Sequence, residues 1–263
     1  MVNTLADTEN LIRRWAAVAS SLRDHAIGLL DQGTLELGNS HLAQPHIFAA
    51  ALLSRTIGNL RATFILIECG MVVEARTLTR CCIENLIWLR RLSTDGAAFV
   101  ERIISDSNAR DIAFANTILP LPLASFLEED DVRLLQERAA QKRPKTISPS
   151  DQIADEEARA DYLLFKMLSN DAAHPSARSL SWHVPRDPVE GRTEFHIEPR
   201  VTREGVQDIM YYSCGAVVKA MALYHLVVPR PGAERIIHQA SQEVLAMGGL
   251  DDVPVRATDP TVA

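Results

Sequence analysis

The sequence predicts an all-α protein, a bundle of about seven or eight helices with a small inserted β-hairpin. Two observations carry the helical assignment. Aromatic residues make up only 5% of the chain, whereas strands favour aromatic and β-branched side chains and helices favour Ala and Leu, which dominate here. Apolar residues also recur every three to five positions over long stretches, which is the spacing of one helix face. Apolar residues make up 47% of the 263 positions, which is enough for a substantial core.

The first predicted helix runs from Asp7 to about Asp31, because apolar residues recur along it and Gly33 follows as a stop signal. The second begins at Pro45, since proline suits the first turn of a helix, and it runs to about Glu68.

The third predicted helix, from residue 71 to about 92, is apolar around nearly its whole circumference, which is typical of a buried central helix. Charge enters it along one oblique row, Arg76, Arg80 and Glu84, spaced four residues apart. Arg80 and Glu84 could simply form an ion pair, or an arginine could hold an anion or orient a histidine. Two arginines and one glutamate leave one positive charge, which needs another carboxylate, a phosphate or solvent.

Helical spacing continues in the second half of the chain, with predicted helices over residues 97–119, 125–141, 151–173, 202–228 and 233–247. A turn over residues 93–96 precedes the first of these. Lys142, Arg143 and Lys145 form a basic loop, either a solvated connector or a contact for a phosphate backbone. Pro175 restricts His174 to extended backbone, so the helix over 151–173 should end there.

Two short stretches alternate apolar and polar residues, Ser181-Trp-His-Val and Thr193-Glu-Phe-His-Ile, with two prolines and a glycine between them. This pattern predicts a β-hairpin over about residues 181–198. We expect residues 1–247 to form a single helical domain and residues 248–263 a disordered tail.

Charge and composition disfavour several function classes, broad nonspecific DNA binding among them. The net charge is −7, whereas nucleic-acid binders usually carry a basic excess. No signal peptide is visible and no apolar run approaches the ~20 residues of a membrane span, so we expect a cytoplasmic protein without a membrane partner. The four cysteines lie in apolar helical context, the histidines lack clustered acidic or cysteine partners, and no glycine-rich phosphate loop occurs. We therefore expect no metal and no cofactor.

A candidate polar site lies between Tyr162 and Ser176. Tyr162 and Ser169 are seven residues apart and share a helix face, and His174 lies just past the helix end. A neutral His174 could act as a general base, with Tyr162 or Ser169 fixing its tautomer. Alternatively, Ser169 and Asn170 satisfy carbonyl groups at the helix end while His174 caps it.

These motifs resemble an uncharacterised family of bacterial all-helical proteins that pair an Arg-x3-Glu helix, here Arg80 and Glu84, with a Ser-x4-His segment, here Ser169 and His174. The resemblance covers about residues 40–228 and implies a fold and a site, since the function of that family is not established.

The segment is also distantly similar to the Arg-Asn-x3-His signature of HEPN domains. Those domains are helical bundles, often dimeric, and many are ribonucleases of toxin–antitoxin or phage-defence systems. Asn170 and His174 match, but Ser169 occupies the arginine position, and a hydroxyl cannot stabilise phosphate charge as a guanidinium does. Arg80 or Arg76 would have to supply that charge.

Two hypotheses follow. In the first, the chain is a non-enzymatic interaction or small-ligand-binding module with a buried Arg/Glu/His polar site. In the alternative, it is a metal-independent HEPN-like ribonuclease or RNA-binding relative, in which Arg80 holds phosphate, Glu84 orients and His174 is the base or acid. Whether the chain is an enzyme stays open. We expect a homo-oligomer, with RNA or a small anionic ligand as further candidate partners.

Overall fold

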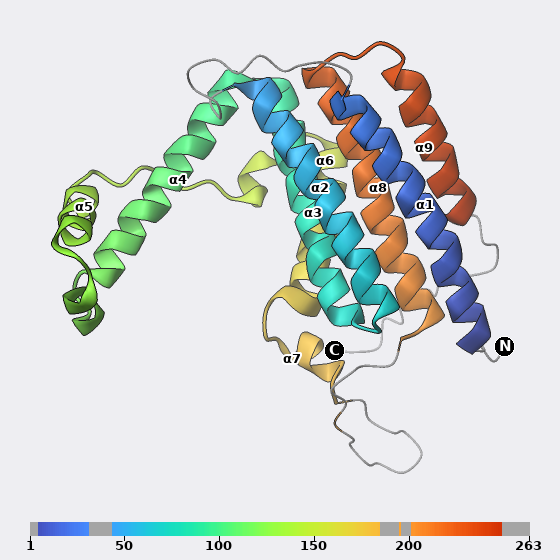
Figure 1. Cartoon of the computed structure of the whole chain (residues 1–263), viewed down its shortest axis with the longest axis horizontal. Coiled ribbons are helices and arrows are strands. Elements are labelled where there is room, and N and C mark those ends of the chain that lie inside the picture. Colours follow the sequence, from blue (N-terminus) through green and yellow to red (C-terminus); the bar gives the residue numbers. More distant parts are fainter. Residues whose placement is uncertain (1–4, 32–43, 185–194, 196–200, 249–263) are drawn as a thin grey trace.

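A computed structural model describes residues 5–31, 44–184, 195 and 201–248. Within these residues the chain forms nine α-helices and no strand, which confirms the all-α class (Figure 1). The helices are α1 (Leu5–Asp31), α2 (Pro45–Glu68), α3 (Val72–Asp95), α4 (Ala97–Ile118), α5 (Glu129–Ala139), α6 (Glu156–Leu168), α7 (Ala177–Ser181), α8 (Arg203–Val227) and α9 (Ala233–Gly248).

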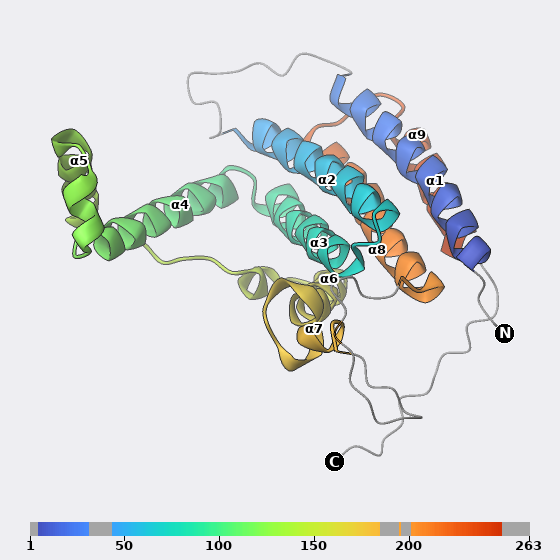
Figure 2. The same ribbon diagram turned by 60° about the horizontal axis from the view of Figure 1, so that its bottom comes forward.

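The main core lies between α1, α2, α3, α8 and α9, which run side by side as a bundle (Figures 1 and 2). The largest fully buried side chains include Trp15, Leu53, Leu86, Phe99 and Tyr224. Helix α3 packs against α2, α8, α6 and α4, so it holds the central position that its apolar circumference predicts. The position of α3 places its charged row against α6.

Helix α3 continues through the predicted turn at residues 93–96 and ends at Asp95. Ser93 and Thr94 remain helical because their hydroxyl groups donate to the carbonyl oxygens of Arg90 and Arg91. Gly96 then has φ 53°, a conformation that glycine adopts more readily than other residues, and the chain turns into α4.

The predicted β-hairpin at about residues 181–198 is not supported. Ser181 is the last residue of α7, a helix that periodicity did not reveal because it is five residues long, and Trp182 continues as a turn. Ser176 begins α7 by accepting a hydrogen bond from Ser179 N (3.0 Å). His183 and Val184 continue as a turn and a bend, and Phe195 is not in a strand either. Residues 185–194 and 196–198 of the predicted hairpin lie outside the described residues, as does the predicted tail from residue 249 onward.

The predicted helix over residues 151–173 is divided into three pieces. Pro149–Gln152 is a 3₁₀ turn, and α6 begins after Asp155, whose side chain accepts from Ala158 N at 2.7 Å. After Leu168 the backbone widens into a π turn over Ser169–Ala173. It ends at His174, which is extended (φ −134°, ψ 144°), as the following proline predicts.

Helices α4 and α5 form an arm that projects from the bundle (Figures 1 and 2). The predicted helix over residues 125–141 starts only at Glu129, because Pro122–Phe126 forms a 3₁₀ turn.

One helix in the described ranges, α2, is long and apolar enough to cross a membrane by length and composition. It packs against α1, α3 and α8, and 39% of its most apolar window is buried. These contacts place α2 within the bundle.

Candidate functional site

Arg80 extends from α3 to the end of α6. Its Nε donates to Ser169 Oγ at 2.9 Å, its guanidinium lies 4.4 Å from the centre of the Phe165 ring, and Nη1 lies 3.3 Å from Glu84 Oε2. The Arg80 and Glu84 side chains are 20% and 29% exposed, so they are partly rather than fully buried. The structure thus joins the charged row of α3 to Ser169, as an ion pair supported by a hydroxyl group and an aromatic face.

The surplus cation of the row, Arg76, is paired with a carboxylate. Arg76 Nη2 lies 2.5 Å from Asp171 Oδ2, and the Asp171 side chain is only 1% exposed. Arg178 contacts the other oxygen of the same carboxylate, and Trp182 lies 5.4 Å from the Arg76 guanidinium. The π turn at Ser169–Ala173 therefore supplies the missing negative charge from a residue that sequence reasoning did not select.

Among the described residues, no contact links the His174 side chain to the charged row or to Asp171. Its side chain is exposed, and its carbonyl oxygen accepts from Ser179 Oγ at 2.8 Å. Asn170 is exposed too, and its carbonyl oxygen accepts from Ser176 Oγ at 2.8 Å. The structure separates the expected histidine from the expected arginine and glutamate and uses the serines to hold the backbone bend.

Tyr162 contributes to packing on this face of α6. Its ring stacks on Phe165, with centroids 6.1 Å apart. Ser169 Oγ in turn donates to the Phe165 carbonyl at 2.7 Å, which is the helix-end role that the alternative interpretation gave it.

A second ion-pair cluster is centred on Asp161, near the middle of α6. Asp161, 3% exposed, contacts Arg90 Nη2 at 3.1 Å and Lys219 Nζ at 2.7 Å. Sequence reasoning missed this residue as well. The signal was present, because Asp161 and Asp171 both fit the three-and-four spacing of Ala158, Phe165 and Leu168 along the buried face of the predicted helix.

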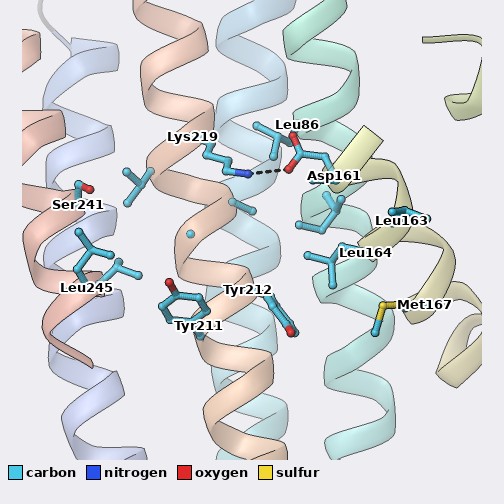
Figure 3. A pocket seen from close by; sticks show the side chains of 16 residues that line it. Leu86, Asp161, Leu163, Leu164, Met167, Tyr211, Tyr212, Lys219, Ser241 and Leu245 are labelled. Atoms are coloured by element: carbon cyan, nitrogen blue, oxygen red, sulfur yellow. Dashed lines mark hydrogen bonds and ion pairs between the residues drawn. The ribbon is translucent and has the colours of Figure 1, made fainter. Parts of the chain in front are cut away.

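A groove lies between α6 and α9, with α8 as its floor (Figure 3). Its volume is about 560 Å³. Leu163 and Met167 of α6 and Leu245 of α9 line it and are more than half exposed. Gly215 lies on the floor, where a Cβ atom would meet no atom within 4 Å. The groove is thus open, apolar and wide at its centre.

Polar groups lie at both ends of this groove. Lys219 and Asp161 lie at one end, and Tyr211 and Tyr212 at the other (Figure 3). Burial raises the pKa of the Tyr212 hydroxyl, with a further rise from Asp208 and an opposing decrease from Arg76. Tyr212 therefore stays protonated at neutral pH and can donate a hydrogen bond.

No group of three His, Cys, Asp or Glu side chains in the part of the chain described could hold a metal ion. Burial raises the pKa of Cys82 and of Cys214, so both thiols stay protonated.

The fold and these features define an all-helical bundle protein. Ion pairs join α3 to Asp161 and Asp171, and an apolar groove lies beside them. The chain belongs to a family of unknown function, DUF5677, whose model matches residues 46–191, more than half of the chain. The matched region runs from α2 through α7 and so contains the charged row, both aspartates and the α6 wall of the groove. Comparison with curated proteins and with solved structures found no match.

Proposed function

We propose that this chain is a non-enzymatic, cytoplasmic small-ligand-binding module whose ligand occupies the groove between α6, α8 and α9. The observation that carries the proposal is the groove itself. Its volume of about 560 Å³ lies in the usual range for small-molecule sites, and its walls are mostly apolar with a few convergent polar groups.

The charged row of α3 supports this assignment because each of its charges has an ion-pair partner within the protein. Arg80 pairs with Glu84 and Ser169, and Arg76 pairs with Asp171. Such pairs hold neighbouring helices in position, whereas the groove leaves apolar side chains exposed to solvent. The ligand site is therefore beside the polar cluster and not within it.

The polar groups of the groove favour a ligand with a hydrogen-bond-accepting, anionic head. The contact with Asp161 uses one of the three N–H donors of Lys219, whose side chain is 50% exposed. Asp161 is shared with Arg90, which offsets the repulsion that its carboxylate would exert on an anion. From Tyr211 to Lys219 the floor of α8 is about 12 Å long at about 1.5 Å per residue. A medium-chain carboxylate matches this length and polarity.

Isothermal titration calorimetry with decanoate and with decan-1-ol tests the proposal. We expect both to bind saturably, with decanoate binding about ten-fold more tightly, because a charge-assisted hydrogen bond contributes roughly 1.5–3 kcal/mol. Lys219→Met should reduce the affinity for decanoate and leave that for decanol unchanged. No saturable binding of either compound would contradict the proposed function.

Variants at two glycines show where the probe binds. Gly215→Phe places a ring in the groove and should abolish binding of both compounds. Gly58→Phe is the matched control, because Gly58 also lies within a helix, α2, with nothing within 4 Å of a Cβ atom, but it does not line the groove. Equal effects of both variants would exclude the groove as the binding site.

One observation favours a second function, HEPN-like cleavage of RNA. Asn170, His174 and Arg178 are all exposed around the bend between the π turn and α7, so a substrate could reach them. The test is incubation of the purified protein with total RNA beside a His174→Ala variant, without added metal. We expect no cleavage above the variant's background, because Ser169 supplies no cation and Arg178 already contacts Asp171.

A further inference from the structure

The outer end of the α4–α5 arm carries large apolar side chains in solvent. Phe126 is 83% exposed, Phe114 61% and Leu134 55%, and Leu121 and Leu127 add to the same region. Apolar surface gathered on a projecting element marks an interaction site more often than apolar residues scattered singly. Figure 2 shows how far α5 lies from the bundle.

Helix α5 has little of its own to stabilise it. It is 11 residues long, none of its residues is buried, and it packs against α4. Isolated helices shorter than about 12–15 residues are marginal in water, so α5 depends on its packing against α4, and a further apolar contact on its outer face would stabilise it. Leu134, in the middle of α5, is exposed and therefore lies on that outer face.

The two ends of α5 carry opposite charge. Its beginning is acidic, with Glu128, Glu129, Asp130 and Asp131, of which Asp130 contacts Arg133 at 3.1 Å. The segment just after its end is basic and exposed, with Lys142 and Arg143, whereas Lys145 further on lies beside Arg102 and Ser105 of α4. A surface that is acidic at one end, apolar in the middle and basic at the other end is complementary to itself when turned through a half rotation.

The geometry points to a second copy of this chain as the occupant: two arms pack with their α5 helices antiparallel, so that the acidic end of each faces the basic segment of the other. Leu134 is midway between the charged ends and lies at the twofold axis, against its own copy. Phe126 and Phe114 flank this contact. Antiparallel α5 helices also place opposite ends of their dipoles side by side. This interface uses residues outside the groove and does not depend on the proposed ligand.

Charge reversal tests this pairing. In one variant Glu129, Asp130 and Asp131 are changed to Lys, and in another Lys142 and Arg143 are changed to Glu. The molar mass in solution is measured by light scattering after size-exclusion chromatography. Wild type should be a dimer, each variant alone a monomer, and an equimolar mixture of the two variants a dimer again, because each end then meets its opposite charge.

Hydrophobic and folding controls complete the experiment. Leu134→Ser should raise the dimer dissociation constant at least ten-fold, whereas Leu180→Ser, at a leucine exposed to nearly the same extent (56%), should leave it unchanged. Circular dichroism checks that each variant keeps the helical content of wild type. A monomeric wild type, a dimer that survives either reversal, or a mixture that stays monomeric overturns the proposal. A monomeric wild type would leave a different protein as the occupant of the arm.

Discussion

Helix α3 is held on its two sides by different forces. Against α2 and α8 it packs with side chains that exclude water, such as Ala75, Leu86 and Leu89. Against α6 the apolar contact is a small cluster of Cys82, Ile83, Ile87, Phe165, Leu168 and Ala216, and ion pairs to Asp161 and Asp171 stand at either end of it.

The difference explains why a groove lies beside α6 and not within the bundle. Apolar side chains in a protein core pack closely, so the contact of α3 with α8 leaves little empty space. Ion pairs of Arg76 and Arg90 fix where α6 lies without filling the volume next to it. Gly215, on the floor of α8, leaves that volume open. We infer that the ion pairs of Arg76 and Arg90 set the width of the groove.

The largest predicted effect on stability comes from removing the buried carboxylate of Asp171. Asp171→Ala leaves Arg76, whose side chain is 12% exposed, without its ion-pair partner. We expect the free energy of unfolding to fall by roughly 3–5 kcal/mol, as for other broken buried pairs. Denaturant titration measures it, with Glu156→Ala as the control, because the Glu156–Arg159 pair is 96% and 65% exposed. A loss for Asp171→Ala no larger than that of the control would remove Asp171 from the structural role assigned to it.

A smaller effect is expected from the Arg80–Glu84 pair. If the row were fully buried, Glu84→Ala would cost as much as the loss of Asp171. Both side chains are partly exposed, and Arg80 keeps its contacts with Ser169 and the Phe165 ring. We therefore expect a loss of about 1 kcal/mol or less in the same denaturant titration. A loss of several kcal/mol would show that the pair is desolvated in solution.

Most of the fold followed from the sequence, because long amphipathic helices are specified locally by apolar spacing. The central position of α3 and its charged row were predictable in the same way. The partner of Arg76 was not, because Asp171 reaches it from a π turn, and the short α7 has too few residues for a periodic signal. The groove was beyond sequence reasoning, since it depends on how α3 and α6 pack against α8 and α9, which lie much later in the chain.

The smallest predicted effect is a gain in stability. Gly58→Ala and Gly215→Ala each add a Cβ atom to a helix interior where no atom lies within 4 Å. Each should raise the free energy of unfolding by about 1 kcal/mol, because alanine favours a helix over glycine by that amount. Thermal unfolding of the two variants measures the gain. A loss at Gly215 alone would mean that the floor of the groove is already filled.

The most direct test of the account is NMR of isotope-labelled methionine methyl groups with added decanoate. Met167 lines the groove and is 53% exposed, whereas Met71, 39% exposed, lies at the turn between α2 and α3. The account predicts that the Met167 resonance shifts saturably with decanoate and that the Met71 resonance does not move. A Met167 resonance unchanged at saturation, or one that moves no more than that of Met71, would contradict a ligand site between α6, α8 and α9.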